Sequence, residues 1–368
     1  MKKICAMLLC LVLVMSMFTG CKSAENDTTK DTPDPTATAA PTAGTSATEA
    51  PAADDSTTDA AVKTGLAVVT SIAKSADAAA DKDGLGEVDS MIAAVLVDKD
   101  GKIVACKIDA AQTKINFSAE GKLITDPATV FQTKQELKEG YNMKGSSSIS
   151  KEWYEQADGF AAYCVGKTVD QIKGIAVNED GVASDADVAA TITVHIGDFI
   201  EVVTKAATNA ADLGAKAGDK LGLATSTDMG QSKDASAEGD GLAQAYSYYT
   251  ALTLDKDGKI TSCAIDASQG NVNFSTAGAV TSDLTVAPQT KQELKEAYDM
   301  KKASGIGKEW YEQANAFAVY ATGKTVADVK GIAVTEDGKA SGADLTASVT
   351  VHVTPFISNI EKAATNAQ

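Results

Sequence analysis

The stretch KQELKEGYNMKGSSSISKEWYEQA (134–157) recurs as KQELKEAYDMKKASGIGKEWYEQA (291–314), a spacing of 157 residues. The correspondence continues without a gap over almost all of two segments, 63–210 and 220–368. A repeat of this length holds a complete domain rather than one unit of a solenoid, and it is long enough to bury a core of its own. The sequence therefore predicts two tandem homologous domains joined by a linker at 211–219.

Each copy is predicted to be an α+β domain, in which a small antiparallel sheet packs with helices. MIAAVLVDKDGKIVACKIDA (91–110) and YYTALTLDKDGKITSCAIDA (248–267) each place two β-favouring runs around Asp-Lys-Asp-Gly, which is typical of a hairpin. Further strands are expected at 114–118 and 271–275. The aspartates of the turn could also suggest calcium, but the spaced carboxylates and the terminal Glu of a calcium loop are missing.

The middle of each copy is predicted to be helical. Thr133 and its counterpart Thr290 begin Thr-Lys-Gln-Glu, the spacing of a capping box. A second helix is expected at 151–165 and in the equivalent segment, because five apolar positions form one stripe. These are Trp153, Ala157, Phe160, Ala161 and Cys164. Trp153 and its counterpart Trp310 could stack on a flat cofactor, but their place in the stripe favours a core role.

The last part of each copy combines a predicted strand with a predicted helix. Alternating apolar residues indicate strands at 190–196 and 347–353. An amphipathic helix then begins at Asp198 or Thr354, and Pro355 stands in the first turn, where proline is favoured. Such a junction exposes backbone N–H groups, which can hold a phosphate.

This order of strands and helices resembles the tandem FMN-binding domains of bacterial surface lipoproteins. In that family an Asp-x-x-Ser-Gly-Ala-Thr-type motif contains the Thr or Ser to which FMN is joined through its phosphate. DADVAAT (185–191) and GADLTAS (342–348) occupy the motif here. The resemblance therefore implies FMN as the cofactor, with Thr191 and Ser348 as its acceptors.

The chain departs from that motif in both copies. Ala189 and Thr346 replace the glycine, and Gly342 replaces the leading aspartate of the second copy. Val188 and Leu345 stand where the family has serine. Loss of glycine removes the close backbone approach that a phosphate requires, which puts covalent attachment in doubt.

Four further residues complete the candidate cofactor-binding site. Asp187 and Asp344 lie within the two motifs, and His195 and His352 follow them at equivalent positions. A histidine here could contact a phosphate or a ligand edge, or respond to mild changes of pH. The alternative is a histidine that faces solvent at the end of a strand. Two histidines without a recognised ligand spacing predict no metal site.

The N-terminus predicts where the protein resides. Residues 1–20 combine two lysines, a short apolar run and small residues, which indicates a secretory signal peptide. Cys21 follows Thr-Gly as in a lipobox and is expected to be lipidated, anchoring the chain to the extracytoplasmic face of the cell membrane. The segment 21–62 holds four of the seven prolines and no aromatic residue. It is predicted to be a disordered tether.

Charge and cysteine content restrict the possible partners and chemistry. The formal net charge of −17 argues against nucleic acid as a partner. Cys106, Cys164 and Cys263 remain beyond the tether, and only the first and last are equivalent. Buried, inert thiols are favoured over a bridge between Cys106 and Cys164 or reactive thiols.

Three functions remain compatible with the sequence. The first is a redox carrier, not an enzyme, that holds flavin in two domains and passes electrons to extracytoplasmic partners. The second is a surface ligand-binding or interaction lipoprotein that has lost flavin binding. The third, an exported hydrolase, lacks a catalytic motif, and no catalytic residue is predicted.

Overall fold

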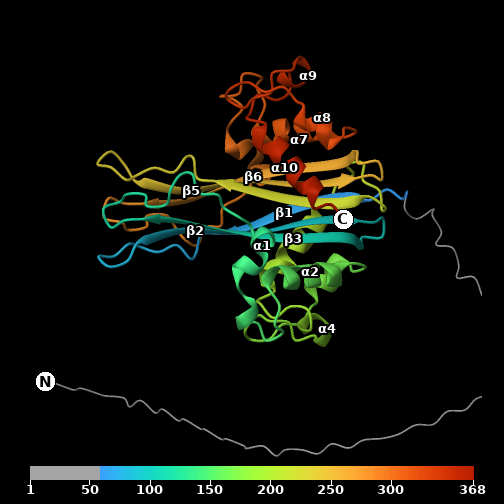
Figure 1. Ribbon diagram of the computed structural model, residues 1–368, viewed down its shortest axis with the longest axis horizontal. Helices are drawn as coiled ribbons and strands as arrows, with labels where there is room; N and C mark the ends of the chain where they lie inside the picture. The colour runs from blue at the N-terminus through green and yellow to red at the C-terminus, as the bar shows by residue number, and fades with distance from the viewer. Residues whose placement is uncertain (1–58) are drawn as a thin grey trace, which may run out of the picture. The chain divides into compact units, whose positions relative to one another are not determined.

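The computed structural model describes residues 59–368, and the strands and α-helices of both repeats follow the same order (Figure 1). The first sheet contains β1 (Lys63–Ser71), β2 (Gly84–Val97) and β3 (Ile103–Phe117), antiparallel in that order. The second sheet contains β4 (Lys220–Asp228), β5 (Gly241–Leu254) and β6 (Ile260–Phe274), again antiparallel and in sequence order. The predicted α+β class, with two equivalent antiparallel sheets packed with helices, is confirmed.

The predicted hairpins join β2 to β3 and β5 to β6. The Asp98 carboxylate accepts hydrogen bonds from the backbone N–H groups of Asp100 and Lys102, at 2.9 and 2.8 Å, so this aspartate serves the turn. The separate strands expected at 114–118 and 271–275 do not exist as such. They are the ends of β3 and β6, because both strands continue unbroken after the turn.

The helices of the two repeats also correspond. The first repeat contains α1 (Lys134–Leu137), η2 (Lys138–Tyr141), η3 (Lys144–Ser146), α2 (Trp153–Cys164), α3 (Val169–Lys173), α4 (Ala186–Ala189) and α5 (Gly197–Thr208). The second contains α6 (Lys291–Leu294), η4 (Lys295–Tyr298), α7 (Trp310–Ala321), α8 (Val326–Lys330), α9 (Ala343–Thr346) and α10 (Thr354–Thr365). The capping boxes predicted at Thr133 and Thr290 are present.

The strands expected at 190–196 and 347–353 are wrong. A short helix, α4 or α9, ends just before each segment, and the chain then forms no strand, apart from an isolated bridge between His352 and Lys339. The backbone N–H of Thr193 instead donates to the side-chain oxygen of Gln156 on α2, at 2.9 Å. Thr350 and Gln313 repeat this bond at 2.7 Å. In each repeat, a glutamine side chain on a neighbouring helix therefore makes the hydrogen bond to the backbone that a neighbouring strand was expected to make.

Each sheet is buried on both faces, which explains the continuous apolar run at 92–96 of β2, where every residue is fully buried. One face of each sheet packs against the helices of its own repeat, around Phe160 and Phe199 in the first and Phe317 and Phe356 in the second. The other face packs against the sheet of the other repeat. Figure 1 shows the two sheets together, with each set of helices on the outer side.

The contacts between the repeats are reciprocal. The rings of Phe117 and Phe274, which are equivalent residues, stack on each other with centroids 4.1 Å apart. The backbone N–H of Leu123 donates to Asp234 at 2.8 Å, and the equivalent N–H of Val280 donates to Asp77 at 2.7 Å. Equivalent surfaces therefore meet each other, as they do across the two-fold axis of an isologous dimer.

Glycine brings the last helix of each repeat close to its first strand. A Cβ at Gly65 in β1 would lie 2.0 Å from the carbonyl oxygen of Ala206 in α5. The equivalent distance, from Gly222 in β4 to Ala363 in α10, is 2.1 Å. Only glycine allows this approach, and it sets α5 and α10 against the sheet edges that border the clefts described below.

Several predictions fall outside the described residues. The signal peptide, lipidated Cys21 and almost all of the tether lie within residues 1–58. Among residues 59–368, no helix has the length and apolar character needed to cross a bilayer.

Candidate functional site

The motif expected to carry flavin is formed by α4 and α9 and the residues that follow them. The hydroxyl of Thr191 donates to the carbonyl oxygen of Val188 at 2.8 Å, and that of Ser348 donates to Leu345 at 3.2 Å. Both acceptor hydroxyls are half-buried. The two predicted acceptors therefore occupy matching positions in the two repeats.

Packing accounts for the exchange of threonine for serine at these positions. A Cβ placed on Gly159 of α2 would lie 3.0 Å from the Cβ of Thr191. In the second repeat the residue equivalent to Gly159 is Ala316, and the facing residue is the smaller Ser348. The smaller Gly159 thus faces the larger Thr191, and the larger Ala316 faces the smaller Ser348, so the space is filled in both repeats.

The other four predicted site residues lie on the surface. Asp187 and Asp344 are exposed on α4 and α9, and His195 and His352 are exposed just before α5 and α10. His195 lies beside Gly181 in the preceding turn, and His352 forms a β-bridge with Lys339. None of the six predicted residues lines either of the two clefts described below.

The surroundings of Thr191 carry negative charge. Asp185 caps α4 by accepting from the backbone N–H groups of Asp187 and Val188, so two carboxylates flank the helix that carries the Thr191 hydrogen bond. A phosphodiester would add negative charge beside them. Trp153 and Trp310 are 3% exposed and belong to the helix-facing cores, which confirms the core role over cofactor stacking.

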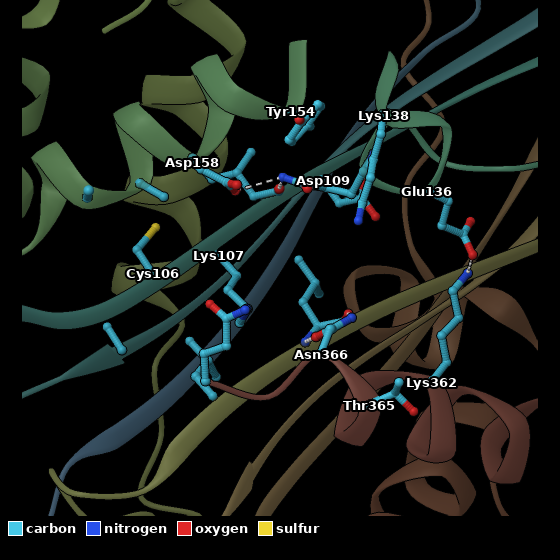
Figure 2. Close-up of a pocket in the computed structure, with 18 of the residues that line it drawn as sticks. Cys106, Lys107, Asp109, Glu136, Lys138, Tyr154, Asp158, Lys362, Thr365 and Asn366 are labelled. Carbon is cyan, nitrogen blue, oxygen red and sulfur yellow. Dashed lines mark hydrogen bonds and ion pairs between the residues drawn. The ribbon is translucent and has the colours of Figure 1, made fainter. Parts of the chain in front are cut away.

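The structure reveals a different pair of candidate sites. The first cleft, of about 770 Å³, lies between β3, α1 and α2 of the first repeat and β4 and α10 of the second. Figure 2 shows Cys106, Lys107 and Asp109 of β3 across from Lys362, Thr365 and Asn366 at the end of the chain. The second cleft, of about 750 Å³, lies between β6, α6 and α7 of the second repeat and β1 and α5 of the first.

The two clefts are equivalent under the duplication. The segment 106–109 in the first corresponds to 263–266 in the second, and Leu223 corresponds to Leu66. Each cleft takes one wall from each repeat, so neither exists within a single repeat.

A buried carboxyl group lies at the floor of each cleft. Asp109 accepts from the backbone N–H groups of Ala110 and Gln135, at 2.7 and 3.2 Å. Burial raises the pKa of Asp109 to about 6, although hydrogen bonds from Thr133 and these N–H groups lower it. Asp266 has the equivalent partners, and burial raises its pKa to about 7. Both carboxyl groups hold the start of a helix, α1 or α6, against the sheet.

An ion pair between repeats crosses one end of each cleft. Lys362 of α10 contacts Glu136 of α1 at 2.7 Å, and Lys205 of α5 contacts Glu293 of α6 at 2.6 Å. Lys205 also donates to the carbonyl oxygen of Val68 at 2.6 Å, as Lys362 does to Thr225. These lysines are only about a third exposed, so both pairs hold the repeats together at the clefts.

The first cleft differs from the second in charge, whereas each is lined by one equivalent cysteine, Cys106 or Cys263. Lys107 and Asp158 are replaced by Ala264 and Asn315 in the second cleft. Cys106, Cys164 and Cys263 are free thiols. The hydrogen bond to Cys164 and burial raise the pKa of Cys106, and burial raises that of Cys263 to about 12. The inert character favoured by the sequence agrees with these environments.

Reasoning from the sequence missed the clefts because they form only when the repeats pack together. A signal was nevertheless present. The polar series Lys-Gln-Glu-Leu-Lys-Glu at 134–139 is identical at 291–296, and it supplies Gln135, Glu136 and Lys138 to the first cleft and their equivalents to the second. By contrast, the flavin-like motif differs between the copies at most positions.

Comparisons of the chain with protein-family models, with curated proteins and with solved structures found no match.

Proposed function

We propose that the protein is a non-catalytic ligand-binding lipoprotein with two equivalent binding clefts, held at the extracytoplasmic face of the membrane through Cys21. The observation that carries the proposal is the occurrence of the same inter-repeat cleft twice. A cleft of this size, with apolar walls and a few fixed polar groups, is the usual form of a small-molecule or peptide site.

The polar groups of the clefts support binding rather than catalysis. Asp109 and Asp266 are engaged by backbone N–H groups, and Glu136 and Glu293 are engaged by lysines. Groups tied in this way position the walls of a site and fix the orientation of a ligand. They are not aligned as a nucleophile with its base.

The proposal is tested with two substitutions at the mouths of the clefts. Ala162 and Val319 are equivalent, exposed, and line the first and second cleft. A tryptophan at either position fills the mouth without entering the core. Residues 22–368 are screened by thermal shift against a panel of flavins, organic acids, sugars and capped peptides, and each hit is titrated by calorimetry.

The expected result is a stoichiometry of two ligands per chain. Ala162→Trp or Val319→Trp alone reduces this to one, and the double variant abolishes binding while its melting temperature without ligand stays close to that of the parent. A panel that gives no hit, or a hit that the double variant still binds, contradicts the cleft proposal.

Flavin carriage on Thr191 and Ser348 is the second candidate, and the matching positions of the two hydroxyl groups favour it. It predicts that the chain, made in a host that supplies the flavin-transfer machinery, is yellow and heavier by up to two FMN groups. Thr191→Ala combined with Ser348→Ala abolishes both signals. A colourless protein of unmodified mass that also fails to bind added FMN or riboflavin eliminates this candidate.

A further inference from the structure

The floor of the first cleft includes an open strand edge. The carbonyl oxygen of Ile108 in β3 accepts a hydrogen bond from the side chain of Gln135 at 3.1 Å. The carbonyl oxygen of Asn116 accepts from the backbone N–H of Ile124, which lies outside the sheet, at 2.8 Å. Even-numbered residues in this part of β3 therefore turn their backbone groups away from β2. In an antiparallel pair the N–H and C=O of one residue point to the same side, so those of Cys106 also face outward.

These outward groups form a short row of hydrogen-bonding positions. The N–H and C=O of Cys106 and the N–H of Ile108 face the cleft, and among the described residues no turn, loop or cap hydrogen bond reaches them. The row stops at Gln135, which already occupies the Ile108 carbonyl. A ligand would pair with this row by accepting from the Cys106 N–H, donating to the Cys106 carbonyl oxygen and accepting from the Ile108 N–H. The backbone of an extended peptide offers these groups in this order.

The second cleft repeats this edge on β6. Gln292 donates to the carbonyl oxygen of Ile265 at 2.9 Å, and the backbone N–H of Thr281 donates to Asn273 at 2.8 Å. The backbone groups of Cys263 and the N–H of Ile265 therefore face outward in the same way. A row of this kind at both clefts distinguishes them from ordinary surface hollows, because sheet edges are commonly covered.

Apolar side chains flank the open edges. Val165 at the first cleft is 45% exposed and Val319 at the second is 74% exposed, among the most exposed large apolar residues of the described chain. Leu223 and Leu66, from the facing strand of the other repeat, line the opposite walls. A ligand that presents apolar side chains on both sides of its backbone would cover these residues.

One lysine in each cleft forms no salt bridge with the described residues, although it lies in the field of the next residue along the chain, Glu139 or Glu296. Lys138 and Lys295 line the clefts and are exposed, and neither takes part in an ion pair with any residue in 59–368. The other cationic groups have acidic partners: Lys362 and Lys205 pair with glutamates, and Lys107 lies in the field of Asp158.

The backbone of these two lysines is strained. Lys138 and Lys295 both have φ of 47°, with ψ of −120° and −118°, a conformation that favours glycine and is unfavourable for other residues. A lysine nevertheless occupies the position in both repeats. Lys138 lines the first cleft together with Asp109 (Figure 2).

We propose that each cleft binds a short extended peptide with an acidic side chain, whose backbone pairs with the open edge at Cys106–Ile108 or Cys263–Ile265. The peptide carboxylate contacts Lys138 in the first cleft and Lys295 in the second. The inference rests on the proposed ligand-binding function and names the class of ligand. Hydrogen bonds to the strand edge supply affinity for any extended chain, and the lysine selects the acidic residue.

The test uses three pools of N-acetylated, C-amidated pentapeptides that contain Val, Leu, Thr or Ala at the outer positions. The first pool has central glutamate, the second central glutamine, and the third central glutamate with N-methylated flanking amides. Retention of each pool by immobilised residues 22–368 is measured by mass spectrometry. The proposal expects the glutamate pool to be retained at least about tenfold more than either of the others, because glutamine cannot form the charge-assisted bond to lysine and N-methylated amides cannot donate to the strand edge.

Variants locate the interaction. Lys138→Gln combined with Lys295→Gln is expected to lower retention of the glutamate pool about tenfold and leave the glutamine pool unchanged. Lys99→Gln, which removes the same charge from an exposed hairpin turn, serves as the control and has no effect. Ala162→Trp combined with Val319→Trp abolishes retention of every pool.

Each remaining outcome overturns a stated part of the proposal. Equal retention of the glutamate and glutamine pools refutes the role of the two lysines, and equal retention of the N-methylated pool refutes pairing with the strand edge. If no pool is retained but another ligand binds in a manner sensitive to the tryptophans, the peptide class is wrong and the binding function stands. If peptides bind equally to the tryptophan variant, both proposals fail.

Discussion

Gly270 in β6 is the glycine at which an added Cβ would approach the other repeat most closely, and its substitution tests the shared core. A Cβ at Gly270 would lie 2.4 Å from Cγ1 of Val88 in β2 of the other repeat. Val88 is 2% exposed and β-branched, so it cannot move aside easily. We expect Gly270→Ala to lower the free energy of unfolding by about 1–3 kcal/mol, the usual cost of overpacking a dense core.

A second substitution should relieve that cost. The residue equivalent to Val88 in the second repeat is Ala245, so alanine is already accommodated at this place in the fold. Val88→Ala alone leaves a small cavity and lowers stability, by about 1–2 kcal/mol. In the double variant the methyl group that Gly270→Ala introduces enters that cavity, and the loss should be smaller than the sum of the single losses by about 1–2 kcal/mol.

Urea unfolding of residues 22–368, followed by circular dichroism, measures these differences. Gly239→Ala is the matched control, because a Cβ there meets nothing within 4 Å, and its effect should stay within about 0.5 kcal/mol. Additive losses for Val88→Ala and Gly270→Ala would show that these residues do not touch. The inter-repeat packing, and with it the two clefts, would then be refuted.

Burial and packing lead to three further predictions. Asn359→Val should stabilise the chain by up to about 1 kcal/mol in urea unfolding, because the buried Asn359 side-chain oxygen has no partner and its removal outweighs the loss of the hydrogen bond from the Asn359 amide to the Tyr248 carbonyl oxygen. The first repeat has Val202 at this position, and a loss of stability contradicts this. Since burial raises the pKa of Asp266 to about 7, from an ordinary value of 3.8, the folded state binds the proton more tightly and stability should rise as pH falls from 8 through 7 towards 4. Asp266→Asn should reduce the difference in unfolding free energy between pH 5 and pH 8, and an unchanged difference refutes the assignment. Segments 59–218 and 219–368, expressed separately, should each lack a cooperative thermal transition and assemble one-to-one on mixing, as measured by light scattering; two segments that each melt sharply alone contradict the shared core.

Local features of the fold were readable from the sequence because short-range interactions determine them. The capping boxes at Thr133 and Thr290 need only four consecutive residues, and the hairpin turn at Asp98 needs five. The segment at 190–196 could not be read in this way. Its alternation suggested a strand, but a side chain from α2 satisfies its backbone, and no local pattern announces such a partner.

The candidate site was less predictable than the fold. A motif resemblance directed attention to Thr191 and Ser348, whose hydroxyl groups bond within their own segment. The clefts depend on how β3 meets β4 and how β1 meets β6, and the sequence suggested two domains that each fold independently. The continuous apolar run at 92–96 held the missing information, because a strand buried on both faces requires a second layer.

The duplication also explains why the two clefts belong to one chain. Gly86 faces its own equivalent, Ala243, and a Cβ at Gly86 would lie 2.7 Å from that of Ala243. If the second repeat paired with another copy of itself, Ala243 of one copy would face Ala243 of the other, with no glycine to leave room for the methyl groups. If the first repeat paired with another copy of itself, Thr113 would take the place of Gly270, its equivalent, and its side chain would meet Val88.

Each self-pairing therefore contains a clash that the natural pairing avoids, which is how an interface becomes specific for one partner. The two clefts are equivalent but not identical in charge. The exchange of Lys107 and Asp158 for Ala264 and Asn315 removes a pair of opposite charges from the second cleft while Lys295 remains. The second cleft should therefore tolerate a wider range of neighbouring side chains, and the first should discriminate among them by charge.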